Sequence, residues 1–294
     1  MSTAIQILHG QARDIGFTVR RLLPQASQRA VGPFVFLDHM GPAHFASGTT
    51  ENDVRPHPHI GLATVTYLFS GAIIHRDSIG VVQRIEPGAV NWMRAGRGVV
   101  HSERIPADIR DNDLDVEGIQ MWVALPESQQ EEEPVFYHYP ATDLPEWEEE
   151  GARFHLLVGT WGARSSPVEQ PSETFYAAGE LQAGARFSFP AHVEERALYV
   201  AQGEIEVEGQ RIGVGELIVL APGEPVDVHA TQAGRVMLLG GAPLDQPRHM
   251  WWNFVSTSRE RIEQAAADWE ADRFPKVPGE HERIPAPPLL KSRA

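Results

Sequence analysis

Turn signals rich in glycine and proline recur about every eight to twelve residues along this 294-residue chain. Near the start, Pro24, Pro33 and Pro42 exclude a continuous helix, because proline removes a backbone donor and clashes with the preceding turn. Between the turns lie short runs of β-branched and aromatic residues, such as 63–69 and 118–125. This pattern is typical of antiparallel sandwiches and barrels, and it predicts an all-β protein.

Two stretches of the sequence, 67–71 and 199–203, are similar to one another, and the length is sufficient for two domains. Weak self-similarity of this kind suggests a duplicated barrel, although glycine-rich strand segments also match by chance. The passage 126–150, rich in proline and glutamate, is expected to carry the crossing between the halves. We place the boundary near residue 140, which gives domains 1–140 and 141–294.

One helix is expected near the C-terminus. Residues 257–260 (Thr-Ser-Arg-Glu) have the spacing of a capping box, with Thr257 as the N-cap, and Pro275 ends the helical pattern. The apolar residues that follow fall on one helical face: Ile262, Ala265, Ala266 and Trp269. This face predicts packing against the core, and the tail 278–294 is expected to lie over the surface or fray.

The composition excludes several classes of protein. No apolar run approaches the roughly 20 residues of a membrane helix, and residues 1–6 lack the features of a secretory signal, so we expect a cytoplasmic protein. A formal net charge of −15 without clustered Lys or Arg argues against direct nucleic-acid binding. The absence of cysteine excludes disulfides and thiolate ligands. Imidazole, carboxylate and water remain as metal ligands.

Two short motifs carry the strongest chemical signal. His57 and His59 are two residues apart, and so are His101 and Glu103. On a β-strand, residues two apart point to the same face, so each pair converges on one side. An isolated histidine is more often a structural residue than a metal ligand, so a structural role is the alternative for His57, His59 and His101. Two matched pairs nevertheless predict one metal site with three imidazoles and one carboxylate.

Longer motifs extend beyond these pairs. They comprise Gly-Pro-Phe-Val-Phe-Leu-Asp-His-Met-Gly-Pro at 32–42, His-Pro-His at 57–59 followed by Thr-Val-Thr-Tyr at 64–67, and Trp-Met-Arg-Ala-Gly-Arg-Gly-Val-Val-His-Ser-Glu at 92–103. Residues 248–255, before the expected helix, add a fourth motif. In these motifs, and over nearly its whole length, the chain resembles the pirins, a branch of the cupin superfamily.

The resemblance implies a bicupin, in which two antiparallel jelly-roll barrels face one another. It also implies one iron ion, Fe(II) or Fe(III), in the N-terminal barrel, held by His57, His59, His101 and Glu103. Zn, Ni, Mn or Cu are alternatives in a purified sample. The chain departs from a common pattern at Ala63, where many relatives have a glutamate, so the tuning of the metal and the substrate range are open.

The second half is expected to be metal-free. His192 lies two residues before Glu194, and His229 follows later, but no His-x-His pair accompanies them. These histidines are therefore interpreted as structural.

The resemblance implies two functions, both found within the family. The first is a dioxygenase that opens quercetin-type flavonols with dioxygen and releases carbon monoxide. Glu103 would then accept the proton of the flavonol 3-hydroxyl. Phe36, Trp92 and Met93 are candidate walls for a flat aromatic substrate, although each could equally fill the barrel core.

The second function is a non-catalytic protein that senses redox state through its iron and binds a regulatory partner, as the mammalian relative does with a transcription regulator. No Lys/Arg-rich targeting run supports a nuclear role here. A cupin isomerase or sugar-binding module is a more distant alternative, because it does not account for pirin-type motifs in both halves.

Overall fold

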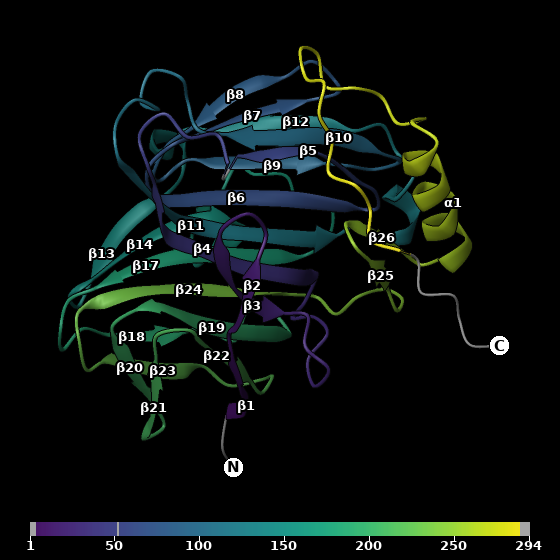
Figure 1. Cartoon of the computed structure of the whole chain (residues 1–294). Helices are drawn as coiled ribbons and strands as arrows, with labels where there is room; N and C mark the ends of the chain where they lie inside the picture. Colours follow the sequence, from purple (N-terminus) through teal and green to yellow (C-terminus); the bar gives the residue numbers. More distant parts are fainter. Residues whose placement is uncertain (1–3, 52, 289–294) are drawn as a thin grey trace.

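Two β-barrels of similar construction make up the molecule, which is described here from a computed structural model (Figure 1). The structure describes residues 4–51 and 53–288. Each barrel combines a seven-stranded sheet with a four-stranded sheet, and the strand pairs within them are antiparallel. The prediction of an all-β protein with two barrels is therefore confirmed.

The first barrel is formed by strands between residues 11 and 139. Its large sheet has the order β12 (Val135–Tyr139), β9 (Val90–Arg94), β6 (Leu62–Ser70), β11 (Leu114–Ala124), β4 (Phe34–Phe45), β3 (Thr18–Leu23) and β2 (Gln11–Asp14). Its small sheet has the order β5 (Val54–His59), β10 (Val99–Arg104), β7 (Ile73–Asp77) and β8 (Val82–Ile85).

The second barrel repeats this design. Its large sheet has the order β1 (Ala4–His9), β22 (Glu216–Leu220), β19 (Glu195–Gln202), β24 (Gly234–Gly241), β17 (Thr174–Leu181), β14 (Ala152–Val158) and β13 (Glu146–Glu149). Its small sheet has the order β18 (Arg186–Phe189), β23 (Val226–Ala230), β20 (Glu204–Val207) and β21 (Gln210–Gly213).

Short elements connect and cover the barrels. They are η1 (Glu127–Gln129), η2 (Ala141–Asp143), the pair β15 (Thr160–Trp161) and β16 (Arg164–Ser165), the pair β25 (His249–Trp251) and β26 (Phe254–Ser256), and the helix α1 (Arg259–Glu270). No helix in the described ranges is long and apolar enough to cross a membrane.

Strand order confirms the repeat predicted from residues 67–71 and 199–203. These stretches end β6 and β19, which occupy the same central place in their large sheets. Gly71 and Gly203 each follow that strand with positive φ, +78° and +79°, a conformation that glycine adopts without a steric penalty. The two halves therefore use the same turn at the same point of the fold.

Both ends of the chain cross to the other barrel. Strand β1, at the N-terminus, pairs with β22 in the second large sheet, where the first barrel has β12. At the other end, β25, β26 and α1 lie against the first barrel (Figure 1), and β26 and α1 pack on residues beside and within β5 and β10. An isolated bridge joins Ile60 to Phe254. The boundary near residue 140 stays a prediction.

Apolar side chains form a different core in each layer. One cluster fills the space between the two large sheets and includes Leu37 and Trp92 from the first barrel and Tyr176 and Leu239 from the second. A second cluster fills the interior of the second barrel, with Phe189 at its centre among several phenylalanines. Inside the first barrel the apolar residues divide into smaller clusters.

The C-terminal helix packs as predicted but begins one residue later. Its N-cap is Ser258, whose Oγ accepts a hydrogen bond from the Arg261 N–H at 3.2 Å. The prediction of Thr257 as the cap is wrong, because that residue lies before the helix, with its hydroxyl directed toward Gln130 and Glu127. The face that contains Ile262, Ala265, Ala266 and Trp269 is buried against the first barrel.

Candidate metal centre

Strands β5 and β10 bring the two predicted motifs side by side. In their antiparallel pairing His101 lies opposite His57, and Val99 lies opposite His59. Strand β5 is the edge of the small sheet, a position that tolerates Pro56 and Pro58 because its outer N–H groups are not needed for pairing. The local sequence thus produces a stiff edge strand with two histidines on its inner face.

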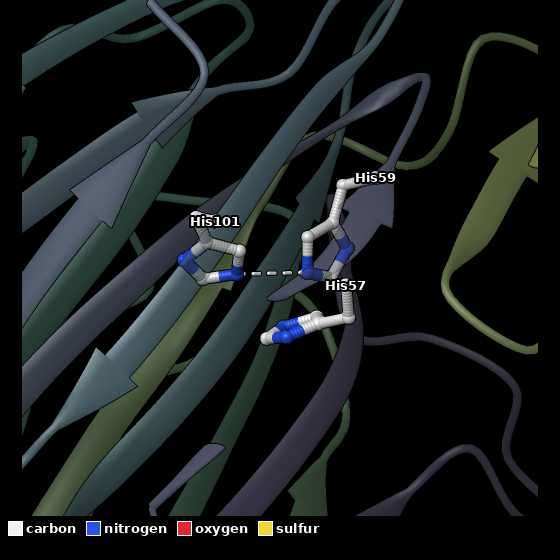
Figure 2. Close-up of side chains that lie close together, drawn as sticks. All are labelled: His57, His59 and His101. Atoms are coloured by element: carbon white, nitrogen blue, oxygen red, sulfur yellow. Dashed lines mark hydrogen bonds between the residues drawn. The ribbon is translucent and has the colours of Figure 1, made fainter. Parts of the chain in front are cut away.

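Three histidines converge at the interior of the first barrel (Figure 2). The ligand atoms of His57, His59 and His101 all lie within 4.8 Å of one another, and Nε2 of His59 is 3.1 Å from Nε2 of His101. Two nitrogens bound at right angles to one metal ion at about 2.1 Å lie about 3.0 Å apart. The spacing of this pair therefore fits two ligands of one ion.

Neighbouring groups select the ring nitrogen that faces this centre. The Nδ1–H of His57 donates to the Arg55 carbonyl at 2.9 Å, and the Nδ1–H of His59 donates to the Asn253 carbonyl at 3.2 Å. Each donation leaves the Nε2 lone pair free. Carbonyl acceptors behind the ring are the usual support of histidine ligands. The donor set thus fits a metal ion.

Burial keeps these imidazoles neutral. It lowers the pKa of His57 from 6.5 to about 4, an effect only partly opposed by the hydrogen bond to the Arg55 carbonyl. Burial likewise lowers the pKa of His59 and of His101 well below the usual range, and the neighbouring histidines add to the shift. Neutral imidazole is the form that binds a metal, so at pH 7 the three histidines have the protonation state that a metal ion needs.

Glu103 lies two residues beyond His101, after an irregularity in the pairing of β10 with β5. Its carboxylate is outside the group formed by the three histidines, and it is the least buried of the four residues. It lines the same cavity as His57 and His59. Burial raises its pKa, against the opposing effects of His75 and of a hydrogen bond with Thr66. Its role as the fourth ligand stays a prediction.

A cavity of about 360 Å³ opens beside the histidines. Its aromatic wall is formed by Phe36 and Trp122, whose rings stack with centroids 3.9 Å apart and planes inclined by 11°. The Trp122 ring also contacts the His59 ring at 5.2 Å. Arg21 lies over the outer face of Phe36, at 4.4 Å, and is held by two hydrogen bonds to Asp38. The cavity thus places an aromatic wall next to His57 and His59.

Two of the three predicted wall residues are located elsewhere. Phe36 lines the cavity, whereas Trp92 and Met93 do not. Trp92 is fully buried between the two large sheets, and Met93 packs on Val99 and Phe136 in a small separate cluster. Strand β9, which contains both, is covered on its two faces, so neither side chain reaches the cavity.

The sequence reasoning missed several residues around the site. Trp122, Trp252 and Asn253 line the cavity, and the last two come from the C-terminal segment. His75 and Asp77 lie behind His101 on the neighbouring strand β7. These two had a usable signal, because they are also two residues apart on a strand, as are the pairs predicted to bind the metal.

Ala63 and the second barrel complete the site predictions. Ala63 is buried in the cluster between the large sheets, on the face of β6 away from the histidines, so no carboxylate is missing from the cavity at this position. In the second barrel, His192 is exposed and its Nδ1–H donates to the Pro190 carbonyl. The absence of a metal there stays a prediction.

Comparison with known proteins places this geometry in a family. The sequence model of pirin matches residues 16–123, and that of the pirin C-terminal cupin domain matches residues 176–275. A pirin-like protein of Caulobacter vibrioides is 47% identical over 96% of this chain and 98% of its own length. The chain belongs to the pirin family. The predicted bicupin architecture is thereby confirmed.

Other pirins have names or structures that concern flavonols. A Pseudomonas aeruginosa protein provisionally named quercetin 2,3-dioxygenase is 39% identical, over 97% of this chain and 90% of its own length. The crystal structure of a quercetin 2,3-dioxygenase from Acinetobacter baumannii superposes with a TM-score of 0.91 at 33% identity, covering 99% of this chain and 97% of that one.

Proposed function

We propose that this pirin is a metal-dependent dioxygenase that opens quercetin-type flavonols with dioxygen and releases carbon monoxide. The proposal rests on one observation, which is that three neutral, convergent histidines lie beside a cavity with an aromatic wall. The volume of the cavity, about 360 Å³, lies within the range of small-molecule sites. The names of similar proteins support a flavonol as the substrate.

His57, His59 and His101 would hold one ion, with Glu103 as the fourth ligand. We propose iron, Fe(II) or Fe(III), because imidazole and carboxylate suit it; Zn, Ni, Mn and Cu accept the same donors in a purified sample. When bound, the ion supplies redox and Lewis-acid chemistry next to the cavity. Because these imidazoles are neutral, none of them has to lose a proton before the ion binds.

Phe36 and Trp122 would bind the flat rings of the substrate. Their rings stack on one another and both line the cavity, and the Trp122 ring contacts His59. Polar groups also line the cavity, notably Asp38 and Gln120. Burial raises the pKa of the Asp38 carboxyl, against the opposing effect of Arg21. We expect Asp38 and Gln120 to bind phenolic hydroxyl groups, which donate hydrogen bonds to carboxylate and amide oxygens.

Glu103 would remove the proton from the flavonol 3-hydroxyl. Its carboxylate lines the cavity beside His57 and His59, which is the placement a general base needs. Deprotonation makes the flavonol ring electron-rich, which is the form that reacts with dioxygen. Glu103 therefore has two proposed roles, one toward the metal and one toward the proton.

Purified protein loaded with Fe(II) tests the proposal. We expect quercetin absorbance to fall in air, not to fall without oxygen, and carbon monoxide to appear in step with the loss. Replacing Glu103→Gln removes the base and should lower kcat by about 100-fold or more. The variant His192→Ala, at an exposed position of the second barrel, is the matched control and should keep full activity.

An iron-loaded protein that leaves quercetin and related flavonols unchanged in air would refute the dioxygenase. That result would favour the alternative, an iron-dependent redox-sensing protein that binds a regulatory partner. The same preparation can then be tested for binding in its ferrous and ferric states.

A further inference from the structure

We propose that Asp77 and His75 are positioning residues that fix the tautomer of His101, so that its Nε2 is free to bind a metal. The inference rests on the metal site of the proposed function and is independent of its substrate. It assigns a role to two buried polar residues on β7 that do not line the cavity.

A chain of short contacts leads from His101 on β10 to His75 and Asp77 on the neighbouring strand β7. Nδ1 of His101 is 3.3 Å from Nδ1 of His75, and Nε2 of His75 is 2.9 Å from Oδ2 of Asp77. All three side chains are almost completely buried, with exposed fractions of 1%, 4% and 0%. Buried polar groups must satisfy one another, so the direction of each hydrogen bond matters.

Asp77 sets that direction, because its carboxylate cannot donate when ionised. Its Oδ1 accepts hydrogen bonds from the backbone N–H groups of Ile79 and Val81, at 3.1 and 3.0 Å. Its Oδ2 therefore faces His75 in a fixed orientation, and His75 Nε2 must donate to it.

The remaining donors follow from this first assignment. When His75 carries a single proton, on the Nε2 that donates to Asp77, its Nδ1 has a lone pair, and His101 then donates to it from its own Nδ1. The Nε2 atom of His101 then has a free lone pair, and it is the atom that faces His59 Nε2. Phe136 stacks on the His75 ring at 4.4 Å and keeps the ring from turning.

This arrangement gives His101 an acceptor of a different kind from those of the other two histidines. His57 and His59 donate to neutral backbone carbonyls, whereas His101 donates through His75 toward a carboxylate. A carboxylate behind a ligand increases the basicity of the ligand and stabilises the bound cation. Asp77 thus places a negative charge behind His101 without occupying a ligand position.

The variant Asp77→Asn tests the chain with little change in shape. The two backbone N–H groups keep the amide oxygen at the Oδ1 position, so the amide NH₂ must face His75 Nε2. His75 then has to accept there and to carry its proton on Nδ1, and His101 has to move its proton to Nε2, where it blocks the metal. We expect cobalt(II) affinity, measured by competition with a chelator, to fall about 10-fold or more.

Two further variants separate tautomer control from packing. His75→Phe keeps a planar ring against Phe136 but removes the acceptor of His101, and it should also lower cobalt(II) affinity and change the visible spectrum of the bound cobalt. The matched control is His39→Gln, since His39 is 1% exposed in the same barrel and contacts Glu117 at 3.1 Å. It should destabilise the fold yet leave cobalt(II) affinity unchanged.

A folded Asp77→Asn or His75→Phe protein that binds cobalt(II) within about twofold of the wild-type affinity would overturn the inference. If Asp77→Asn does not fold, His75→Phe decides the question. The cobalt titration contains no flavonol, so the two proposals can fail separately. Wild-type protein that binds metal tightly but does not consume quercetin would refute the dioxygenase and leave the role of Asp77 and His75 intact.

Discussion

The two barrels share one strand order but contain opposite interiors. In the small sheets, β5, β10 and β7 of the first barrel correspond by order and register to β18, β23 and β20 of the second. Every polar residue of the candidate metal site, with Glu103 as its predicted fourth ligand, and of the chain behind it has an apolar counterpart. The corresponding pairs are His57 and Phe187, His59 and Phe189, His101 and Val228, Glu103 and Ala230, His75 and Ile205, and Asp77 and Val207.

The difference between these interiors distinguishes residues that stabilise the fold from residues that belong to the candidate site. The six residues of the second barrel are all buried within one apolar cluster, so this interior stabilises the fold directly. In the first barrel the same positions hold groups that are costly to bury and need partners for every donor and acceptor. The first barrel also keeps an open cavity, which removes packing contacts. The second barrel shows the same architecture with apolar side chains at these positions.

The largest expected effect comes from giving the first barrel a residue of the second. His101→Val introduces the residue type found at Val228 and removes the Nε2 that faces His59. We expect metal affinity to fall by more than about 100-fold, which is beyond the usual loss for a supporting residue. Metal content after dialysis, measured by elemental analysis, checks this. Unchanged content beside the His192→Ala control would show that His101 is not a ligand.

Removing a ring from each barrel compares their packing. Phe189→Ala should lower the free energy of unfolding by about 3 to 5 kcal/mol, because its ring is completely buried among other aromatic rings. Phe36→Ala should cost less, at most about 3 kcal/mol, because this ring already borders a cavity. Denaturant unfolding of the metal-free variants measures both values. Equal losses would contradict the view that only the second barrel is fully packed.

The metal-free first barrel should be sensitive to acid. Burial lowers the pKa of His57 from 6.5 to about 4, so between these values the unfolded chain binds more protons than the folded one. Stability is therefore lost as the pH falls from about 7 to 4, by up to about 1.4 kcal/mol per pH unit for each such histidine. His101→Val should make this dependence shallower, since burial lowers the pKa of His101 as well. Thermal unfolding across this pH range gives the slopes.

The sequence predicted the parts of this comparison that depend on local patterns. Turn spacing gave the strands, alternate spacing placed His57 beside His59, and the repeat at residues 67–71 and 199–203 gave the two barrels. These signals work because a strand is short and its side chains alternate between faces. His75 and Asp77 had the same spacing, and a search for His-x-Asp as well as His-x-His would have included them.

Contacts between distant segments could not be predicted in this way. Trp92 was expected at the cavity wall, but β9 is buried on both faces. Its sequence therefore does not alternate between apolar and polar residues, and it could not indicate which side chains point toward the cavity. Trp122 takes that place from β11, which is separated from β9 by β6 in the same sheet. Asn253, which accepts from His59, lies 194 residues further along the chain. The crossing of β1 to the second barrel also depends on long-range pairing, which local sequence does not encode.

The smallest effect concerns the C-terminal segment, which covers the site in the first barrel. Ser258 caps α1, and the helix holds the segment that supplies Asn253 to His59. Ser258→Ala should lower the free energy of unfolding by about 1 kcal/mol, the usual cost of a lost N-cap. Thr257→Ala is the matched control and should cost less, because the Thr257 hydroxyl makes only long hydrogen bonds, 3.4 Å to Gln130 and 3.5 Å to Glu127. Denaturant unfolding measures both. A larger loss for Thr257→Ala than for Ser258→Ala would restore the cap predicted from the sequence.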